Sequence, residues 1–515
     1  MKIPKEKEIQ LQKTLYDYLR EHATRCAMKS YLITEDRTIT YQEALYAVDN
    51  LAQKFASFGM KKGDLVAFRA TRSPDTALIV IALASIGAIV VTTDAHFTVR
   101  DYIKNTGVDI IPNWYITNEE LGLKIDASGG WSLQKEEEEV AKLHFEFTEK
   151  ANEWGMYEMT KVSPEEPFMI IFTSGSTGKS KAVMLSHKNC IANPVDAMPL
   201  FEQNEKDRAI SLLPLNHVFG FAVISCATFC CHDVVFPKST DVEYVLECIQ
   251  KYKISVLYAV PTFILGLLAD GKHKNYDVTS LRLGLMAGGP FTAKQMSFIE
   301  GELGLQLMPG YGMSECVGIS TMRYNDPVED RAAGVGRLYP MTEAFILDED
   351  GVELGVGETG EICVKGATQM IGYYNNEEAT KEVVDKLGRL HTGDLGYFDE
   401  KGILHINGRK KDLIIRGGEN ISVGKVESAL LKTEGVFQVA VAPIPNEKYG
   451  EIVGAMIMLE KGVNYTEEHT RCLLKDKLSK HEIPEVIVFV DDFPKTSSGK
   501  IDKIKVKEIM KKYGK

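Results

Sequence analysis

The sequence lacks an apolar run long enough to span a membrane. Its most apolar stretch, ALIVIALASIGAIVV at residues 77–91, is shorter than the ~20 residues of a membrane-spanning helix and contains a glycine. We therefore expect a buried helix that runs into a buried strand. The amino-terminal stretch MKIPKEKEIQLQKTLYDYL is charged and has no apolar core, unlike a secretory signal peptide, so we expect a cytoplasmic protein without a transmembrane segment.

The chain also has no excess of positive charge and no regular spacing of cysteines. A protein with a net charge of −12 does not have the basic footprint that nucleic-acid binding requires, and no nucleic-acid partner is expected. The nine cysteines are scattered and odd in number, which indicates a reducing compartment rather than a disulfide framework. The cluster CATFCCH at residues 226–232 does not have the spacing of a standard zinc site, and its cysteines are interpreted as small buried apolar residues.

The chain shows neither an internal repeat nor a low-complexity linker, so its domains must be inferred from changes in pattern. With 515 residues it is longer than one hydrophobic core usually organises. An amphipathic helix at 40–60, the strand KGDLVAFRA and further alternation through residues 62–310 indicate parallel α/β layers. The charged run QKEEEEVAK at 134–142 is interpreted as the solvated face of a helix.

The pattern changes after residue 340, where short strands and glycine turns predict a β-rich subdomain. Beyond GRKKDLIIRGGEN we expect a compact α+β unit, with helices at GKVESALLKTEG and 466–480 and strands at VFQVAVAPIP and VGAMIMLE. The predicted fold class is therefore α/β. It has a large N-terminal domain of stacked α/β layers plus the β-rich subdomain (1–410) and a small α+β C-terminal domain (411–515).

Residues 173–181, TSGSTGKSK, form a loop rich in glycine, serine and lysine after the apolar strand FMIIF. A Walker-type phosphate loop requires G-x-x-x-x-G-K-[ST] ahead of a helix. Here Thr173 stands where the first glycine should be, and the following AVMLSH is β-prone. The loop could still bind phosphate through glycine amides, hydroxyls and Lys181. From these residues alone, phosphate binding and a plain turn between two strands both stay open.

Three further segments accompany this loop: GYGMSE at 310–315, HTGDLGYFDEKGILHINGRKKDLIIRGGENIS at 391–422 and PKTSSGKI at 494–501. In this order and at these separations, the set strongly resembles the adenylate-forming (AMP-binding) superfamily. That superfamily contains acyl-CoA synthetases, aryl-CoA ligases, luciferases and peptide-synthetase adenylation domains. The resemblance covers nearly the whole chain and implies a reaction in two steps. A carboxylate attacks the α-phosphate of ATP to give an acyl-adenylate and pyrophosphate, and a thiol, usually coenzyme A, then displaces AMP.

The resemblance implies a catalytic role for three residues. Lys500 would bridge the carboxylate and the α-phosphate, two anions that meet in the first step. Glu315 would hold Mg²⁺, a hard ion that prefers oxygen ligands, and is the predicted metal ligand. His217, in SLLPLNHVFGF at 211–221, would gate or line the acyl pocket.

The resemblance also implies a nucleotide site. Asp394 would accept both ribose hydroxyls, with Arg409 on the same side, and Tyr311 would lie along the adenine. Ser314 would contact phosphate, and the loop 173–181 would close over the β- and γ-phosphates. The segment LMAGGPF at 285–291 would lie between nucleotide and acyl group. The predicted cofactor-binding residues are Thr173, Ser174, Gly175, Ser176, Thr177, Gly178, Lys181, Gly288, Gly289, Pro290, Gly310, Tyr311, Gly312, Met313, Ser314, Asp394, Arg409 and Gly418.

The small C-terminal domain is implied to be mobile. In the family it rotates between the two steps, and the matching hinge position here is Lys411. After rotation the loop RGGENIS would line the channel for the pantetheine arm, where Gly418 leaves room because it has no side chain.

We therefore expect a carboxylate–CoA ligase that uses ATP, Mg²⁺ and coenzyme A. Segments 215–221, 285–290 and 311–319 are mostly apolar or small, which favours a hydrophobic or aromatic acid, and Asn216 stands where many fatty-acid members have an aromatic residue. One alternative is a stand-alone adenylation enzyme that loads a carrier protein in trans. Another is a P-loop NTPase, for which the Walker order and a following helix are missing. The oligomeric state stays open, a homodimer included.

Overall fold

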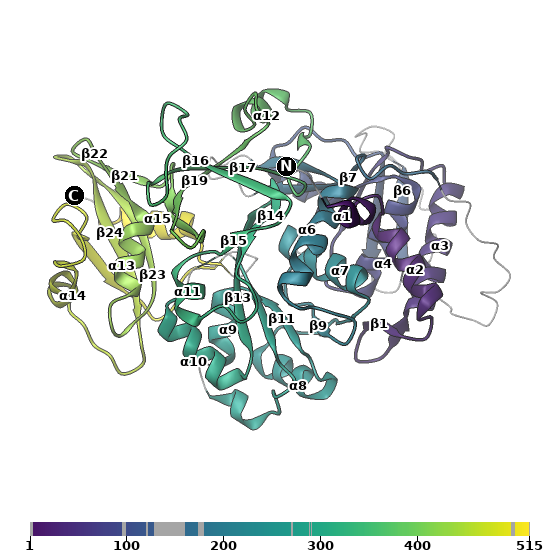
Figure 1. Ribbon diagram of the computed structural model, residues 1–515, viewed down its shortest axis with the longest axis horizontal. Helices are drawn as coiled ribbons and strands as arrows, with labels where there is room; N and C mark the ends of the chain where they lie inside the picture. Colours follow the sequence, from purple (N-terminus) through teal and green to yellow (C-terminus); the bar gives the residue numbers. More distant parts are fainter. Residues whose placement is uncertain are drawn as a thin grey trace.

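The computed structural model describes residues 4–94, 99–119, 122–127, 160–173, 180–268, 271–287, 289, 291–495 and 500–513. Four β-sheets and the helices around them organise these residues (Figure 1). The charged run predicted as a helical face at 134–142 lies outside the described residues. None of the helices in the described part of the chain is long and apolar enough to cross a membrane.

The largest sheet has nine strands in the order β15-β14-β13-β12-β11-β9-β10-β1-β2. In the middle of the sheet, the adjacent strands β1, β10, β9, β11, β12 and β13 pair in parallel. Antiparallel pairs close both edges. The strands are β1 (Ser30–Ile33), β2 (Thr38–Thr40), β9 (Arg208–Ile210), β10 (Asp233–Val235), β11 (Val256–Ala259), β12 (Leu283–Met286), β13 (Gln306–Met313), β14 (Cys316–Thr321) and β15 (Arg337–Leu338).

The second sheet has seven strands in the order β18-β8-β7-β4-β3-β5-β6, with a parallel centre formed by β7, β4, β3 and β5. Both sheets confirm the parallel α/β layers expected between residues 62 and 310. The strands are β3 (Leu65–Arg69), β4 (Ile89–Thr93), β5 (Trp114–Glu119), β6 (Gly122–Ala127), β7 (Pro167–Thr173), β8 (Lys181–Ser186) and β18 (Gly372–Tyr373).

The two large sheets share a hydrophobic core. Side chains alternate between the faces of a strand, so Tyr258 packs in the shared core while its neighbour Leu257 packs against helices on the outer face. The helices that contribute to the shared core are α2 (Leu15–Arg25), α3 (Tyr41–Ser57), α4 (Pro74–Ile86), α6 (His187–Leu200) and α7 (Val218–Cys230). The outer faces are covered by α5 (Val99–Thr106) on the seven-stranded sheet and by α8 (Val242–Tyr252), α9 (Pro261–Leu268) and α10 (Ala293–Leu303) on the nine-stranded sheet.

The apolar stretch 77–91 forms the buried helix and strand that the sequence predicts. Helix α4 starts at the cap Ser73, whose hydroxyl accepts from the N–H of Thr76, and Pro74 occupies its first position. It ends at Gly87, which has φ of +73°, a conformation that glycine adopts without strain. Every helix residue from Thr76 to Ile86 is buried, so the apolar run belongs to the core.

The expected β-rich subdomain is a four-stranded antiparallel sheet, and the expected α+β unit follows it. The four-stranded sheet consists of β16 (Thr342–Leu347), β17 (Gly360–Gly366), β19 (Leu390–Phe398) and β20 (Leu404–Arg409). The last sheet consists of β21 (Leu413–Arg416), β22 (Glu419–Ser422), β23 (Val436–Asn446), β24 (Gly450–Leu459) and β25 (Val486–Phe489). With α13 (Val423–Leu431), α14 (Glu467–Leu474) and α15 (Lys503–Lys511) it forms a separate unit at one end of the molecule (Figure 1).

The helix expected at 466–480 is shorter than predicted, because α14 ends at Leu474. The chain continues in turns, in which the N–H and hydroxyl of Ser479 donate to the carboxylate of Glu482. Serine side chains compete with the helical backbone in this way. The remaining described helices are α1 (Lys5–Gln10), η2 (Lys272–Asn275), α11 (Val328–Ala333) and α12 (Glu377–Val383).

Candidate active site

The glycine-, serine- and lysine-rich loop joins two antiparallel strands. Thr173 at the end of β7 pairs with Lys181 at the start of β8, and the N–H of Lys181 donates to Thr173 Oγ1 at 3.3 Å. A Walker-type loop aims the N-terminus of a following helix at phosphate, and here a strand follows. The P-loop NTPase alternative is therefore excluded. Ser174, Gly175, Ser176, Thr177 and Gly178 lie outside the described residues.

Tyr373 links this loop to Glu315. The ammonium of Lys181 lies 4.5 Å from the centre of the Tyr373 ring, and the Tyr373 hydroxyl donates to Glu315 Oε1 at 2.8 Å. Burial, followed by the negative charge of Glu315, raises the pKa of Tyr373, which keeps the hydroxyl protonated as a donor. Glu315 and Ser314 form the tight turn between β13 and β14, where Met313 pairs with Cys316.

Tyr373 was missed by sequence reasoning. It lies on the short strand β18, opposite Val183 of β8, and is buried. The stretch GYYNN contains no local signal that separates Tyr373 from the adjacent Tyr374. Only the pairing of β18 with β8 brings the Tyr373 hydroxyl to Glu315.

Asp394 is held by donors from two different sheets. Tyr311, on β13, donates to Asp394 Oδ2 at 2.5 Å, and Arg409, opposite Asp394 on β20, donates from Nε to Oδ1 at 3.0 Å. Asp394 is 5% exposed. Burial and then the charge of Asp394 raise the pKa of Tyr311 well above its usual value. Each carboxylate oxygen keeps a second lone pair, so the carboxylate can still accept from a ligand.

A β-bulge gives Asp394 this position. Strand β17 pairs Glu361 with Leu395 and Cys363 with His391, so two steps along β17 match four along β19. The extra residues lie between His391 and Leu395 and include Gly393, which has φ of +73°. Bulges of this kind bend a strand and redirect its side chains, and this one directs Asp394 toward β13.

Lys500, which belongs to the C-terminal unit, brings a positive charge to the surroundings of Arg409 and His217. Desolvation, then the charge of Arg409, lowers the pKa of Lys500, although its side chain is still exposed. Desolvation, then the charge of Lys500, lowers the pKa of the half-buried His217, and the charge of Asp94 opposes that shift. The charge of Lys500 therefore acts on both Arg409 and His217, the first residue ahead of α7.

The predicted glycine segments meet at the carboxyl ends of two parallel strands. Met286 at the end of β12 pairs with Pro309 of β13, and a side chain on Gly310 would lie 3.8 Å from the Met286 carbonyl oxygen, whereas one on Gly289 would meet Pro261 at 3.3 Å. A side chain on Gly312 would lie 3.0 Å from the backbone nitrogen of Gly318, so this position is closely packed. Gly288 and Pro290 lie outside the described residues.

Two further predicted residues lie in exposed turns. Lys411 is exposed in the turn between β20 and β21. Gly418 is exposed in the turn between β21 and β22, with φ of +92°, and a side chain there would meet no atom within 4 Å. This arrangement therefore brings Lys500 to the site and leaves Gly418 unpacked.

In the part of the chain that the structure describes, the cysteines of CATFCCH do not belong to a group of three close potential metal ligands. Cys226 and Cys230 lie on α7 and Cys231 caps its end. Burial raises the pKa of the Cys230 thiol, as expected for a small apolar residue. Within the described ranges, the three neighbouring side chains able to ligate a metal are instead Glu361, Cys363 and His391.

Comparison with known proteins agrees with this arrangement. Residues 19–374 match the model of the AMP-binding enzyme family, and residues 425–500 match that of the AMP-binding enzyme C-terminal domain. A long-chain-fatty-acid–CoA ligase of Bacillus subtilis is 29% identical, over 95% of this chain and 93% of its own.

Two solved structures are similar over the whole chain. ATP-bound MatB from Rhodopseudomonas palustris has a TM-score of 0.82 at 25% identity and covers 98% of this chain and 99% of its own. The o-succinylbenzoate coenzyme A synthetase MenE of Bacillus subtilis, in complex with ATP and magnesium, has a TM-score of 0.75 at 26% identity and covers 95% and 98%. The family matches cover most of the sequence, and the chain belongs to the AMP-binding enzymes, as an acid–thiol ligase that forms an acyl-adenylate.

Proposed function

We propose that this chain activates a hydrophobic or aromatic carboxylic acid with ATP and then transfers the acyl group to coenzyme A. The position of Lys500 carries the proposal. Its charge acts on Arg409, which holds Asp394, and on His217, within the segment expected to line the acyl pocket. A cation there lies between the two anions that must meet in the first step.

In the first step, a carboxylate oxygen of the acid attacks the α-phosphorus of ATP and pyrophosphate leaves. Lys500 stabilises the charge that collects on both reactants. Lys181 and the hydroxyls and amides of the loop after Thr173 would bind the departing phosphates. Asp394, oriented by Tyr311 and Arg409, would accept from the ribose hydroxyls.

Glu315 is the proposed ligand of Mg²⁺. Its carboxylate offers oxygen donors, the type that this ion prefers, and the Tyr373 hydroxyl engages only Oε1. When bound, the ion would neutralise charge on the phosphates. Tyr373 would fix the direction of the carboxylate, in the way that hydrogen-bonded neighbours orient metal ligands.

In the second step, the thiol of coenzyme A displaces AMP from the acyl-adenylate. We propose that the domain formed by residues 411–515 rotates about Lys411 before this step. The rotation would withdraw Lys500 and bring the turn that contains Gly418 to the channel for the thiol arm. Exclusion of water in one step and admission of a long thiol in the next require two arrangements of the protein.

The nature of the proposed acid follows from the segments around His217. Leu213, Leu215 and Phe221 are buried apolar residues, and Asn216 is buried beside them. Apolar walls favour a hydrophobic acid, because they gain free energy by covering apolar surface. The Bacillus subtilis relative takes long-chain fatty acids by its name, and MenE takes o-succinylbenzoate, so both aliphatic and aromatic acids belong in the test.

A panel of acids in a pyrophosphate-release assay tests the function. Aliphatic acids of graded length and aromatic acids should release pyrophosphate, whereas amino acids and a reaction without acid should not. Thioester formation is then measured with free coenzyme A and with a phosphopantetheine-bearing carrier protein. Transfer only to the carrier would contradict the proposed acceptor, and release without any acid would contradict a ligase.

Glu315→Gln is expected to raise the Mg²⁺ concentration needed for half-maximal adenylation and to lower its maximal rate. The substitution keeps the shape of the side chain and removes the charge that a hard cation requires. The measurement is pyrophosphate release during Mg²⁺ titration at fixed ATP.

Tyr373→Phe is the matched control for this experiment. It keeps the aromatic ring against Lys181 and removes only the hydrogen bond to Glu315. We expect a smaller shift of the Mg²⁺ titration than for Glu315→Gln. An unchanged titration in Glu315→Gln would show that this carboxylate does not bind the ion.

A further inference from the structure

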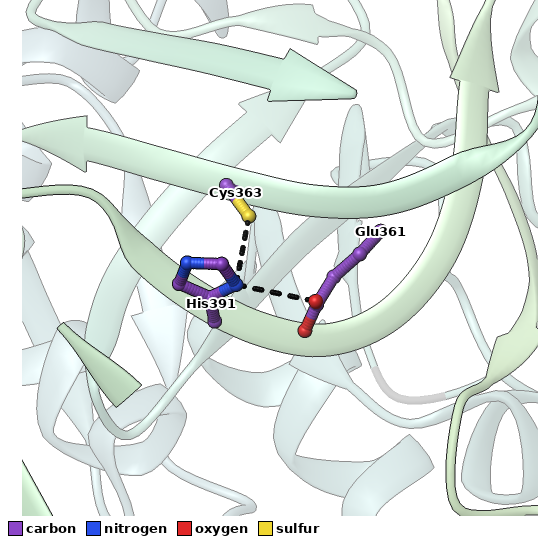
Figure 2. Close-up of side chains that lie close together, drawn as sticks. All are labelled: Glu361, Cys363 and His391. Atoms are coloured by element: carbon purple, nitrogen blue, oxygen red, sulfur yellow. Dashed lines mark hydrogen bonds and ion pairs between the residues drawn. The ribbon is translucent and has the colours of Figure 1, made fainter. Parts of the chain in front are cut away.

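A group of three potential metal ligands lies on the four-stranded sheet, outside the proposed catalytic set (Figure 2). Glu361 and Cys363 are two residues apart on β17, so their side chains share one face of the sheet. His391 pairs with Cys363 from the neighbouring strand β19. The bulge that begins after His391 brings the imidazole within reach of Glu361 as well.

The spacing of the three ligand atoms suits a single tetrahedral ion. Nδ1 of His391 lies 3.3 Å from Cys363 Sγ and 3.2 Å from Glu361 Oε2, and all three ligand atoms lie within 4.8 Å of one another (Figure 2). Zinc bonds of about 2.0–2.3 Å at tetrahedral angles place neighbouring ligand atoms roughly 3.2–3.6 Å apart. The two separations from His391 Nδ1 fall in that range, so an ion could enter after an adjustment of the Cys363 and Glu361 side chains.

The surroundings of His391 resemble the outer sphere of a metal site. Asp385 Oδ2 lies 3.8 Å from His391 Nε2, on the side of the ring opposite the Nδ1 that faces Cys363 and Glu361. Arg389 donates to the same oxygen at 2.7 Å and holds it in place. A hydrogen bond from the far nitrogen of a histidine to a carboxylate fixes the tautomer that leaves the near nitrogen free to coordinate, and Asp385 would have to move closer by roughly 1 Å to accept it.

The structure also shows how an ion would reach the three ligands and which side chain would compete with it. The His391 side chain is 30% exposed, whereas Cys363 is fully buried, so an ion would enter past the imidazole. Lys410 Nζ lies 3.3 Å from Glu361 Oε2 and competes with a cation for this oxygen. Lys410 is exposed, so its side chain can turn into solvent when an ion arrives.

We propose that Glu361, Cys363 and His391 form a binding site for one Zn²⁺-class cation, with a fourth coordination position open to water. A thiolate, an imidazole and a carboxylate together select a borderline transition-metal ion over Mg²⁺ or Ca²⁺. The site is distinct from the one proposed for Mg²⁺ at Glu315.

The experiment uses the full-length protein, stripped of metal with a chelator and free of ATP. Titration with Co²⁺ should produce a thiolate-to-cobalt charge-transfer band in the near ultraviolet. Calorimetry with Zn²⁺ should show one equivalent bound, and Zn²⁺ should bleach the cobalt band. Absence of the band in the wild-type protein would overturn the proposal without recourse to any variant.

Variants assign the bound ion to this site. Cys363→Ser should abolish the charge-transfer band, and Asp385→Asn, which keeps the Oδ1 acceptor of its turn, should weaken Zn²⁺ binding about 10- to 100-fold. Lys410→Ala should tighten binding, because it removes the competing ammonium.

Two control variants remove a cysteine and a histidine that lie outside the proposed site. Cys472→Ser removes an exposed cysteine of α14, and His405→Gln removes a histidine of β20 that bonds Asp399 at 2.9 Å. Both should leave the band and the affinity unchanged. If Cys363→Ser is folded by circular dichroism and keeps the band, or if Cys472→Ser loses it, the thiolate is not Cys363 and the proposal is wrong.

Discussion

Lys500→Ala is expected to slow acyl-adenylate formation by about 100- to 1000-fold, the usual cost of one positioned charge-stabilising group. The thioester step from pre-formed acyl-adenylate should stay near the wild-type rate. The reason is position: Lys500 lies near Arg409 and His217 in the described arrangement, where nucleotide and acid would meet. Rapid-quench assays of the two half-reactions measure the effects separately.

Lys495→Ala is the matched control for Lys500→Ala. Lys495 lies near the start of the same segment, is exposed, and pairs with Asp492 at 2.9 Å. Exposed pairs of this kind contribute little, so both half-reactions should proceed at wild-type rates. If Lys500→Ala instead slows both half-reactions equally, Lys500 does not act specifically by stabilising the carboxylate and the α-phosphate in the first step.

Lys411→Pro and Gly418→Leu are expected to leave adenylation near normal and to slow thioester formation. Among the described residues of the turn, the amides of Lys410 and Asp412 make the backbone hydrogen bonds, so proline at 411 removes neither. A fixed φ would hold the C-terminal unit near its present arrangement. Acyl transfer to coenzyme A would then rely on a minor orientation of the C-terminal unit, populated at roughly 0.1–10%. Its rate should therefore fall by about 10- to 1000-fold. At Gly418, a leucine would fill the proposed channel.

The leucine substitution needs a control for backbone strain, because Gly418 has a positive φ. Gly402→Leu supplies it. Gly402 lies in the exposed turn between β19 and β20, has φ of +71°, and also has no atom within 4 Å of a built side chain. It should leave both half-reactions intact. Wild-type acyl-CoA formation by both Lys411→Pro and Gly418→Leu would show that domain alternation is not the mechanism.

Local signals made much of this fold predictable. Ser73, Pro74 and Gly87 mark the ends of α4 in the sequence itself, and the β-prone residues after Lys181 indicated the strand that follows the loop. Motif order supplied what local signals could not, namely that Tyr311, Asp394 and Arg409 would belong to one site. The structure shows Tyr311 and Arg409 each donating a hydrogen bond to Asp394.

Long-range pairing accounts for what the sequence did not predict. Tyr373 reaches Glu315 only because β18 pairs with β8. Cys363 and His391 are far apart along the chain and meet only through the register of β17 and β19, which is shifted by a bulge. Strand register depends on contacts across the whole sheet. Spacing in the sequence alone could therefore identify neither Tyr373 as the partner of Glu315 nor His391 as the partner of Cys363.

The C-terminal unit carries hydrophobic clusters of its own, between Ile414 and Met510. Among the described residues, Phe437 packs against the helices of the nine-stranded sheet, and polar contacts to that layer include Gln295 Nε2 to the Phe437 carbonyl at 3.0 Å. Contacts of this kind are worth about 1 kcal/mol each, far less than the roughly 8 kcal/mol released when a ligand binds at micromolar affinity. Under the proposed rotation, occupancy of the active site can outweigh these contacts, and the proportion of molecules in each orientation would follow the concentrations of nucleotide and thiol around the enzyme.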